Sequence, residues 1–264
     1  LIDTPDGSWY AYLFRDYGAV GRIPYLVPVK WVDGWPVLGD NGKVPETLNL
    51  PPRKGLITGL VTSDEFNRKK GDRSFPLAWQ WNHNPDNKHW SLTDRKGFLR
   101  ITTGRIDTSF YLVKNILTQR TIGPVSTGSI MMDVSKMKDG DFAGLSLLQK
   151  KYGQVGVRLE NGEKSVVVVV TDESGKQIES GRVPLHRNTI YLKAECDFRN
   201  LADTAKFFYS TDGKAWVPIG SSLKMSYTLP HFMGYRFGLF NYATKEPGGY
   251  TDFDFFHVDD RISK

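Results

Sequence analysis

Hydrophobic and polar residues alternate along most of this chain in short stretches, the pattern of β-strands buried on one face. Ser8 to Phe14 is the first such stretch, and the Pro5-Asp6-Gly7 segment before it has the composition of a turn. Val166 to Val170 is an uninterrupted run of valine and indicates a buried strand. Stretches with helical periodicity are scarce. The pattern therefore predicts an all-β protein.

The predicted strands form two groups. The first group is 8–14, 25–31 and 35–38. The second group is 98–102, 109–114, 126–132, 143–149, 155–160, 166–171, 189–196, 205–210, 235–242 and 251–258. Asn161-Gly162 and Asp212-Gly213 are hairpin-turn dipeptides within it. This many strands without helices predicts a two-sheet sandwich.

A change in composition between the groups predicts the domain organisation. Residues 1–44 form a small β unit, 45–59 form a linker rich in Pro and Gly, and 60–264 form the sandwich. The small unit holds the aromatic residues Trp9, Tyr12, Phe14, Trp31 and Trp35. Such a sheet has too much apolar surface to stand alone, so it must pack on other structure.

Composition narrows the class of protein further. The 264 residues contain 13% aromatic residues and 26 Gly, which suits strands joined by tight turns. No apolar run is long enough for a membrane-spanning helix, so no membrane partner is expected. The single Cys196 excludes an internal disulfide and is expected to be a buried thiol. The chain begins at Leu1 without a visible signal peptide, which suggests a processed or truncated fragment; a secreted or periplasmic location is favoured over a cytoplasmic one.

The net charge of +6 is spread along the chain, with no basic run longer than Arg68-Lys69-Lys70. Nucleic-acid-binding domains usually carry a clustered basic stripe, so no nucleic-acid partner is expected. The excess charge fits solubility or weak attraction to acidic polymers.

One aromatic stretch suggests binding of a sugar polymer. Trp79, Trp81 and His83 alternate with amide residues and are predicted to share one face of a strand at 78–86. Indole rings stack on the apolar face of a pyranose, and imidazole and amide groups bond its hydroxyls. The alternative is that both tryptophans lie in the sandwich core. Further polar partners are expected from a glycine-containing turn: Gln149, Tyr152 and Gln154.

Catalytic motifs are absent from the sequence. It contains no Gly-x-Ser-x-Gly elbow, P-loop or His-Glu-x-x-His motif, and its five histidines lack metal-ligand spacing. Glycoside hydrolysis needs two opposed carboxyl groups, which linear spacing cannot reveal.

A calcium site is a further hypothesis. Asp64 and Glu65 open the sandwich and Asp254 lies in its last predicted strand, and first and last strands of a sandwich often pair. Their carboxylates and carbonyls could together supply the oxygen ligands that Ca²⁺ prefers. The alternative is that Asp252 and Asp254 are solvated residues alternating with core Phe253 and Phe255.

Several motifs together resemble the C-terminal half of glycoside hydrolase family 43 β-xylosidases and α-L-arabinofuranosidases. They are Gly21-Arg22, 26–36, Asp64-Glu65-Phe66, 79–86, Trp90-Ser91-Leu92, 140–145, Tyr152-Gly153 and 252–256. The resemblance covers nearly the whole chain. It implies a concanavalin A-like β-sandwich (jelly roll), also described as a xylan-binding module, preceded by the remnant of the last blade of a β-propeller.

The same resemblance implies that the catalytic residues lie outside this sequence. In that family the catalytic carboxylates lie on earlier propeller blades, which this sequence does not contain, and the parent reaction is inverting hydrolysis. Arg22 matches an arginine that reaches the central pocket and contacts the sugar; the alternative is a surface arginine after a loop glycine. The chain is therefore expected to be a non-catalytic portion of a xylan-degrading glycosidase.

The implied partners are xylan or xylo-oligosaccharides and the N-terminal propeller polypeptide. The sandwich would bind β-1,4-linked chains of the xylan type or complete the glycosidase active site. Two alternatives stay open: a free-standing carbohydrate-binding module, and a purely structural sandwich that stabilises a propeller.

Overall fold

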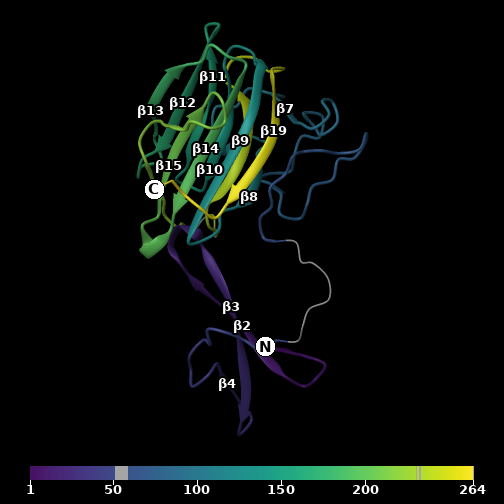
Figure 1. The fold of residues 1–264 in the computed structure, drawn as a ribbon, viewed down its shortest axis with the longest axis vertical. Helices are drawn as coiled ribbons and strands as arrows, with labels where there is room; N and C mark the ends of the chain where they lie inside the picture. The colour runs from purple at the N-terminus through teal and green to yellow at the C-terminus, as the bar shows by residue number, and fades with distance from the viewer. Residues whose placement is uncertain (51–58, 230, 232, 264) are drawn as a thin grey trace. The chain divides into compact units, whose positions relative to one another are not determined.

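The computed structural model describes residues 1–50, 59–229, 231 and 233–263 (Figure 1). Most of the predicted linker, residues 51–58, lies outside the described residues. The chain divides into two compact units. Unit 1 takes in Leu1–Tyr17 and Gly21–Ile57, and unit 2 takes in Gly18–Val20 and Thr58–Lys264. No helix among the described residues is long and apolar enough to cross a membrane.

Unit 1 is a four-stranded antiparallel sheet in the order β1-β2-β3-β4. Its strands are β1 (Ile2–Asp3), β2 (Trp9–Asp16), β3 (Arg22–Val32) and β4 (Trp35–Leu38). The Asp33-Gly34 turn joins β3 to β4 with both residues at positive φ, 49° and 79°, which suits the right-handed twist of a hairpin. Its core is small: Ala11, Val27 and Val29, with Trp9 and Leu38 packed against them.

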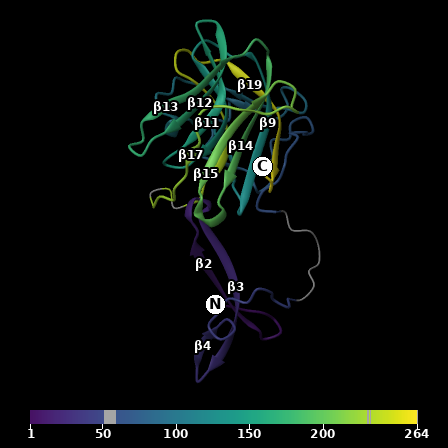
Figure 2. The ribbon, with the colours of Figure 1, turned by 60° about the vertical axis from the view of Figure 1, so that its left-hand side comes forward.

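Unit 2 is a sandwich of two sheets (Figures 1 and 2). The seven-stranded sheet has the order β13 (Gln177–Pro184), β12 (Glu163–Thr171), β11 (Gly153–Glu160), β10 (Asp141–Leu148), β18 (Arg236–Ala243), β8 (Leu117–Arg120) and β5 (Gln80–Trp81). The eight-stranded sheet has the order β16 (Val217–Pro218), β15 (Thr204–Ser210), β14 (Thr189–Asp197), β9 (Val125–Lys136), β19 (Tyr250–Asp259), β7 (Leu99–Thr102) and β6 (Trp90–Ser91), with β17 (Leu223–Lys224) paired to β15.

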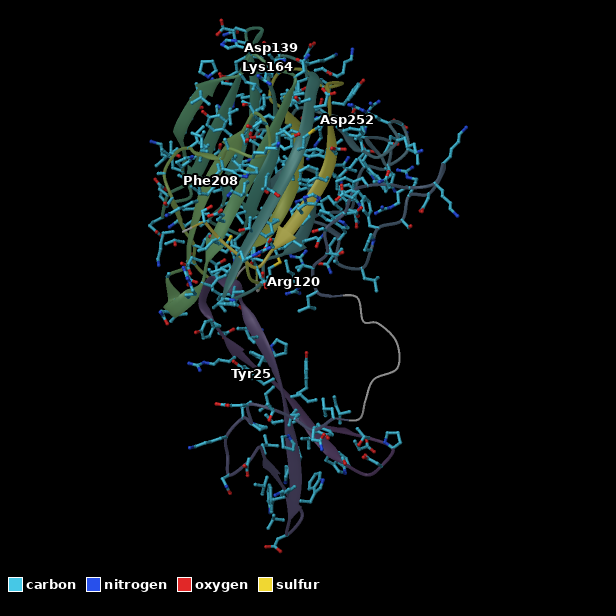
Figure 3. All side chains as sticks on the ribbon, in the orientation of Figure 1. Tyr25, Arg120, Asp139, Lys164, Phe208 and Asp252 are labelled. Atoms are coloured by element: carbon cyan, nitrogen blue, oxygen red, sulfur yellow. The ribbon has the colours of Figure 1, made fainter. Side chains whose placement is uncertain are left out.

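The main core lies between the two sheets and follows from the period-two pattern. Alternate residues of β10, Ala143, Leu145 and Leu147, are fully buried in this core. Cys196 on β14 is also buried there, as expected, and burial raises the pKa of its thiol. Figure 3 shows the side chains on the ribbon, including Asp252 on β19. The carboxylate of Asp252 is held by Arg100 at 2.7 Å, so it is an ion-pair partner rather than a solvated group.

A second hydrophobic cluster covers the opposite face of the seven-stranded sheet. Its members are Phe110, Val113, Ile116, Phe142, Leu148, Tyr152, Val167, Val169, Phe240 and Tyr242. Val166, Val168 and Val170 point into the main core while Val167 and Val169 point into this cluster, which explains the unbroken valine run.

Two predicted strands are wrong. Residues 109–114 contain the short 3-10 helix η2 (Phe110–Leu112), because Phe110 and Val113 must both turn toward the second cluster. In the predicted strand at 78–86, only Gln80 and Trp81 pair with a neighbouring strand. Another 3-10 segment, η1 (Gly18–Val20), belongs to unit 2, where Ala19 N–H donates to Asp203 Oδ2 at 3.1 Å.

Candidate functional site

The predicted aromatic face of Trp79, Trp81 and His83 does not form as one exposed surface. Trp79 is only 6% exposed, and its ring centroid lies 5.0 Å from that of Phe256. Trp81 is half-buried and packs against Trp90, with ring centroids 5.2 Å apart. The indole of Trp79 is therefore part of the core, and the strand breaks after Trp81 before His83 could share its face.

His83 is exposed and is instead joined to the segment that covers the second cluster. Its Nε2 lies 2.6 Å from the carbonyl oxygen of Tyr111, so this nitrogen carries the proton. The Tyr111 ring packs edge-on against Tyr152, with centroids 5.2 Å apart, and its hydroxyl lies 3.5 Å from the carbonyl oxygen of Gln149. Tyr111, which sequence reasoning missed, thus brings His83, Gln149 and Tyr152 into one neighbourhood.

The other predicted sugar partners in this neighbourhood lie below the surface. Gln149 is buried: its Oε1 accepts from the Thr228 hydroxyl at 2.7 Å and its Nε2 donates to the Met233 carbonyl at 3.0 Å. Tyr152 is 2% exposed, and burial raises the pKa of its hydroxyl. Gln154 is fully buried and neither atom of its amide has a partner among the described residues. In this neighbourhood His83 and Leu112 are exposed and Tyr111 is half-buried.

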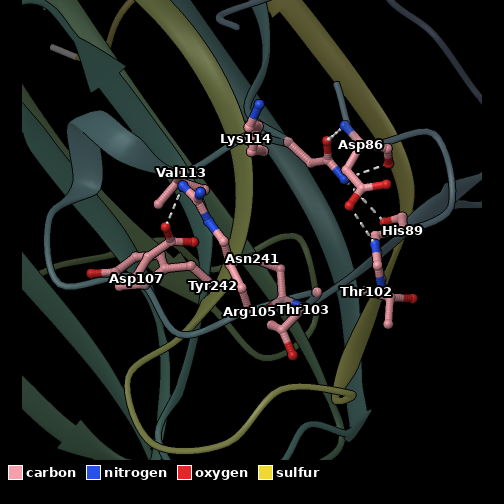
Figure 4. A pocket seen from close by; sticks show the side chains of 12 residues that line it. Asp86, His89, Thr102, Thr103, Arg105, Asp107, Val113, Lys114, Asn241 and Tyr242 are labelled. Carbon is pink, nitrogen blue, oxygen red and sulfur yellow. Dashed lines mark hydrogen bonds and ion pairs between the residues drawn. The ribbon is translucent and has the colours of Figure 1, made fainter. Parts of the chain in front are cut away.

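A small pocket of about 50 Å³ opens beside this segment (Figure 4). Two ion pairs border it: His89 Nδ1 lies 2.9 Å from Asp86 Oδ2, and Arg105 Nη2 lies 2.7 Å from Asp107 Oδ1. The Lys88 backbone N–H and then His89 lower the pKa of Asp86. A volume of this size holds water molecules but not a pyranose ring, so the pocket could take only a substituent of a sugar.

Asn115 positions one wall of that pocket and gave no signal in the sequence. Its side chain is 5% exposed and accepts from Asp86 N–H at 2.9 Å, while its Nδ2 donates to the carbonyls of Asp86 and His89. Arg236 is a second unforeseen group, buried at the start of β18 and donating to the Thr118 hydroxyl at 2.9 Å. Burial, and then Arg120, lowers the pKa of Arg236 to about 10.

The three predicted calcium ligands have different surroundings. The start of the sandwich reaches its last strand, β19, through an isolated bridge rather than a paired strand: Asp64 N–H donates to the Phe256 carbonyl at 2.8 Å, and Phe256 N–H donates back at 2.9 Å. The Asp64 carboxylate is occupied by protein donors, with Arg68 at 2.6 Å, Phe66 N–H at 2.8 Å and Trp79 Nε1–H at 3.0 Å. Asp64 therefore does not fit a calcium ligand.

Glu65 and Asp254 are less occupied by protein donors than Asp64 is. Glu65 is exposed and lies 2.5 Å from His257 Nε2. Burial, and then the charge of Glu65, raise the pKa of Asp254. Across the described residues, no group of three or more His, Cys, Asp or Glu side chains is placed to hold a metal ion. Calcium thus stays a prediction that depends on Glu65 and Asp254.

Arg22 lies in unit 1, at the start of β3. Its Nε donates to Asp16 Oδ1 at 2.9 Å, and its guanidinium lies 4.4 Å from the centre of the Phe14 ring. Cation–π stacking and the ion pair hold the side chain in one direction.

Comparison with known proteins identifies the chain. Residues 63–259 match the family described as the beta-xylosidase C-terminal concanavalin A-like domain. The chain belongs to this family. The sandwich with its antiparallel sheets is accordingly of the concanavalin A-like type, and the resemblance to glycoside hydrolase family 43 is confirmed.

The relatives are longer proteins of the same group. The chain is 31% identical to a beta-xylosidase from Formosa agariphila over 98% of this chain and 47% of that protein. It is 33% identical to a putative beta-xylosidase from Xylanibacter ruminicola over 86% of this chain and 41% of that protein. A solved structure named bifunctional GH43-CE from Bacteroides eggerthii is 66% identical with a TM-score of 0.93, over 100% of this chain and 34% of that chain. The chain thus spans half or less of the length of these relatives.

Proposed function

We propose that the chain is the non-catalytic C-terminal part of a xylan-degrading glycosidase of the β-xylosidase or α-L-arabinofuranosidase type. In this role unit 1 completes a β-propeller that carries the catalytic carboxylates. The sandwich supports that propeller and binds chains of the xylan type. The family membership and the names of the longer relatives, which include beta-xylosidases and an α-L-arabinofuranosidase, support the proposal.

The observation that carries the proposal is the exposed aromatic surface of unit 1. Tyr12 and Phe14 are 63% and 59% exposed and alternate on β2, so they lie on the same face of the sheet. Trp35 on β4 is 75% exposed. A sheet with rings exposed to this degree gains stability by packing on another surface. The missing blades of a propeller are the occupant that the family membership favours.

The test is reconstitution with the polypeptide encoded upstream of Leu1. We expect the two polypeptides to associate and to hydrolyse an aryl xyloside or arabinoside together. The double variant Phe14→Ala/Trp35→Ala should weaken association by at least tenfold, because it removes exposed anchors from the interface. Leu201→Ala, which truncates an exposed residue of unit 2, is the matched control. The absence of an upstream propeller, or association that ignores the unit 1 variants, would contradict the proposal.

A free-standing carbohydrate-binding module is the second candidate. The neighbourhood of His83, Tyr111 and Leu112 favours it, because an imidazole, an aromatic ring and an exposed apolar side chain meet beside a small polar pocket. Net hydrogen bonds are worth about 1 kcal/mol each and association entropy opposes binding, so the affinity for xylo-oligosaccharides should be micromolar to millimolar.

Calorimetric titration with xylo-oligosaccharides separates binding from a purely structural role. We expect His83→Ala to reduce the binding affinity and to lower the melting temperature only slightly, because the side chain is exposed and loses one hydrogen bond, to the Tyr111 carbonyl. His186→Ala is the control, since His186 is also exposed and lies elsewhere in unit 2. If the wild-type chain shows no heat of binding and no retention on xylan, the sandwich is structural.

A further inference from the structure

The basic run noted in the sequence forms part of a cleft in unit 2. The cleft has a volume of about 500 Å³ and is lined by Arg68, Lys69, Lys70, Thr93 and Lys96. No carboxylate is among the residues that line it. Residues from two separate loops contribute, so the sequence shows only three of the four basic residues together.

Two turns of the same design present the lysines. In the first turn, Asp72 N–H donates to the Lys69 carbonyl at 2.9 Å, and Gly71 has a φ of 84°. In the second, Phe98 N–H donates to the Arg95 carbonyl at 3.1 Å, and Gly97 has a φ of 78°. Each turn therefore carries a lysine followed by a glycine at its tip, Lys70 in the first and Lys96 in the second.

The two turns lie beside each other. A Cβ atom at Gly97 would lie 3.2 Å from Asn67 Oδ1, so the second turn touches the base of the first. Arg68 Nε donates to the Ser74 carbonyl at 3.1 Å and closes the loop. Because Arg68 is itself held by buried Asp64, the first loop is anchored to the core rather than free in solvent.

The charge in the cleft is largely uncompensated. Arg68 is paired with Asp64; hydrogen bonds from Ser74, and then the charges of Arg68 and Lys69, lower the pKa of Asp72. Lys69, Lys70 and Lys96 are exposed, and no ion pair or side-chain hydrogen bond joins them to another described residue. Three ammonium groups and the Thr93 hydroxyl thus face one open space with donors available.

We infer that this cleft binds the carboxylate groups of an acidic polysaccharide, namely uronate substituents on the polymer that the proposed function assigns to this protein. An open cleft with flexible lysines suits an anion carried on a chain, because ammonium groups attract charge without demanding one geometry. The inference rests on the proposed function for its choice of polymer over other polyanions. None of the residues that line the cleft belongs to the His83 neighbourhood.

Binding of two matched polymers tests the inference. Glucuronate-substituted xylan and the same xylan after reduction of its carboxyl groups are titrated against the 264-residue chain at low and high salt. We expect the acidic polymer to bind more tightly at low salt and the difference to vanish at high salt, where screening removes exposed charge interactions. Lys69→Gln/Lys70→Gln/Lys96→Gln should lower affinity for the acidic polymer by about tenfold and leave the reduced polymer unaffected.

A second triple variant controls for net charge. Lys176→Gln/Lys206→Gln/Lys214→Gln removes the same charge from exposed positions of unit 2 outside the cleft and should leave binding unchanged. Equal loss in both variants, equal binding of both polymers, or tighter binding of a DNA duplex through the cleft lysines would overturn the inference. Binding of the acidic polymer alone would support the inference while contradicting general xylan binding. Equal binding of both polymers would contradict the inference while supporting general xylan binding.

Discussion

At the scale of single residues, Asp64 is notable because its one carboxylate bonds three different parts of the fold. Its carboxylate bonds the Arg68 guanidinium, the Trp79 indole N–H and the Phe66 backbone N–H, and its own side chain is 5% exposed. Phe66 is held at a φ of 50° and is fully buried by this contact. One carboxylate therefore joins an aromatic core, a strained turn and the basic loop.

We expect Asp64→Ala to lower the free energy of unfolding by about 3–5 kcal/mol, because it removes the carboxylate of the part-buried Arg68 and leaves the buried Trp79 indole N–H without an acceptor. Urea denaturation followed by tryptophan fluorescence measures the change. Glu65→Ala, at the neighbouring exposed position, should change stability by less than about 0.5 kcal/mol. Equal effects of the two variants would show that the Asp64 contacts do not stabilise the fold.

Asp141 is a second residue with a measurable signature. It is fully buried at the start of β10, and burial raises its pKa from 3.8 to about 6 although Lys138 N–H donates to it at 2.7 Å. The folded chain thus keeps this proton to a higher pH than the unfolded chain does. The stability that Asp141 contributes is complete below about pH 4 and is lost as the pH rises from 4 to 6.

We expect Asp141→Asn to gain up to about 3 kcal/mol relative to wild type as the pH rises through that window. Denaturant unfolding of both proteins measures this difference. The range from about pH 3.5 to about pH 7 covers the whole titration of Asp141. Asp139→Asn is the control, because Lys245 lowers the pKa of Asp139 and its contribution is lost as the pH falls instead. A pH-independent difference for Asp141→Asn would contradict the prediction.

At the scale of elements, the covering segment around η2 decides what the outer face of the seven-stranded sheet can do. Phe110 packs on Tyr152 and Phe240, with ring centroids 4.9 and 5.2 Å apart. The face that the sequence pattern would leave for a ligand is therefore filled by the chain itself. Any ligand meets the segment rather than the sheet.

We expect Asn115→Ala to cost about 1–3 kcal/mol, because it leaves the Asp86 backbone N–H without its acceptor and removes one of the donors to the carbonyls of Asp86 and His89. Amide hydrogen exchange should show faster exchange at Asp86, whose N–H bonds the Asn115 carbonyl oxygen. Asn84→Ala, an exposed change in the same loop, is the matched control. Unchanged protection at Asp86 would contradict the assigned role.

The junction of Asp64 with β19 carries the calcium prediction. If Glu65 and Asp254 bind Ca²⁺, addition of calcium should raise the melting temperature by mass action, and a chelator should reverse the effect. Glu65→Gln/Asp254→Asn should abolish that response, while Asp259→Asn on the same strand should preserve it. An identical melting temperature with calcium and with chelator would refute the site.

At the scale of the whole molecule, the two units differ in self-sufficiency. Unit 2 has a contiguous core between its sheets and a second cluster outside them. Unit 1 has a core of three buried residues and exposes several large rings. A sheet of this kind contributes surface to a larger assembly more readily than it forms a site by itself.

We expect the pure chain to show no xylosidase or arabinofuranosidase activity, because the proposed function assigns the catalytic carboxylates to propeller blades other than unit 1. Release of nitrophenol from aryl xyloside and arabinoside substrates measures this. An Arg22→Ala variant should lower activity only in a reconstituted enzyme. Turnover by the pure chain that one Asp or Glu substitution in it abolishes would contradict the prediction.

Long alternating or uniformly apolar stretches were the predictable parts of the fold. The strands of β10, β12 and β19 follow directly from their residues, because burial on one or both faces leaves a period-two or continuous apolar pattern. Residues 109–114 misled the prediction, because the cluster on the outer face, not local propensity, sets the backbone there. Trp79 and Trp81 gave a true signal of aromatic packing, but exposure depends on distant Phe256 and Trp90.

The sequence by itself determined the all-β class, the position of the small N-terminal unit and the kinship with family 43, since these depend on local patterns and motifs. Only the tertiary structure decided which polar groups are accessible. Gln149 and Tyr152 are buried by contacts with remote segments. The Asp64 carboxylate accepts hydrogen bonds from Arg68 and Trp79. Lys96 lines the same cleft as Lys69 and Lys70 although it lies on another loop. The physical reason is that burial and charge clustering depend on residues that are far apart in the chain. A local sequence pattern does not show which of these residues come into contact.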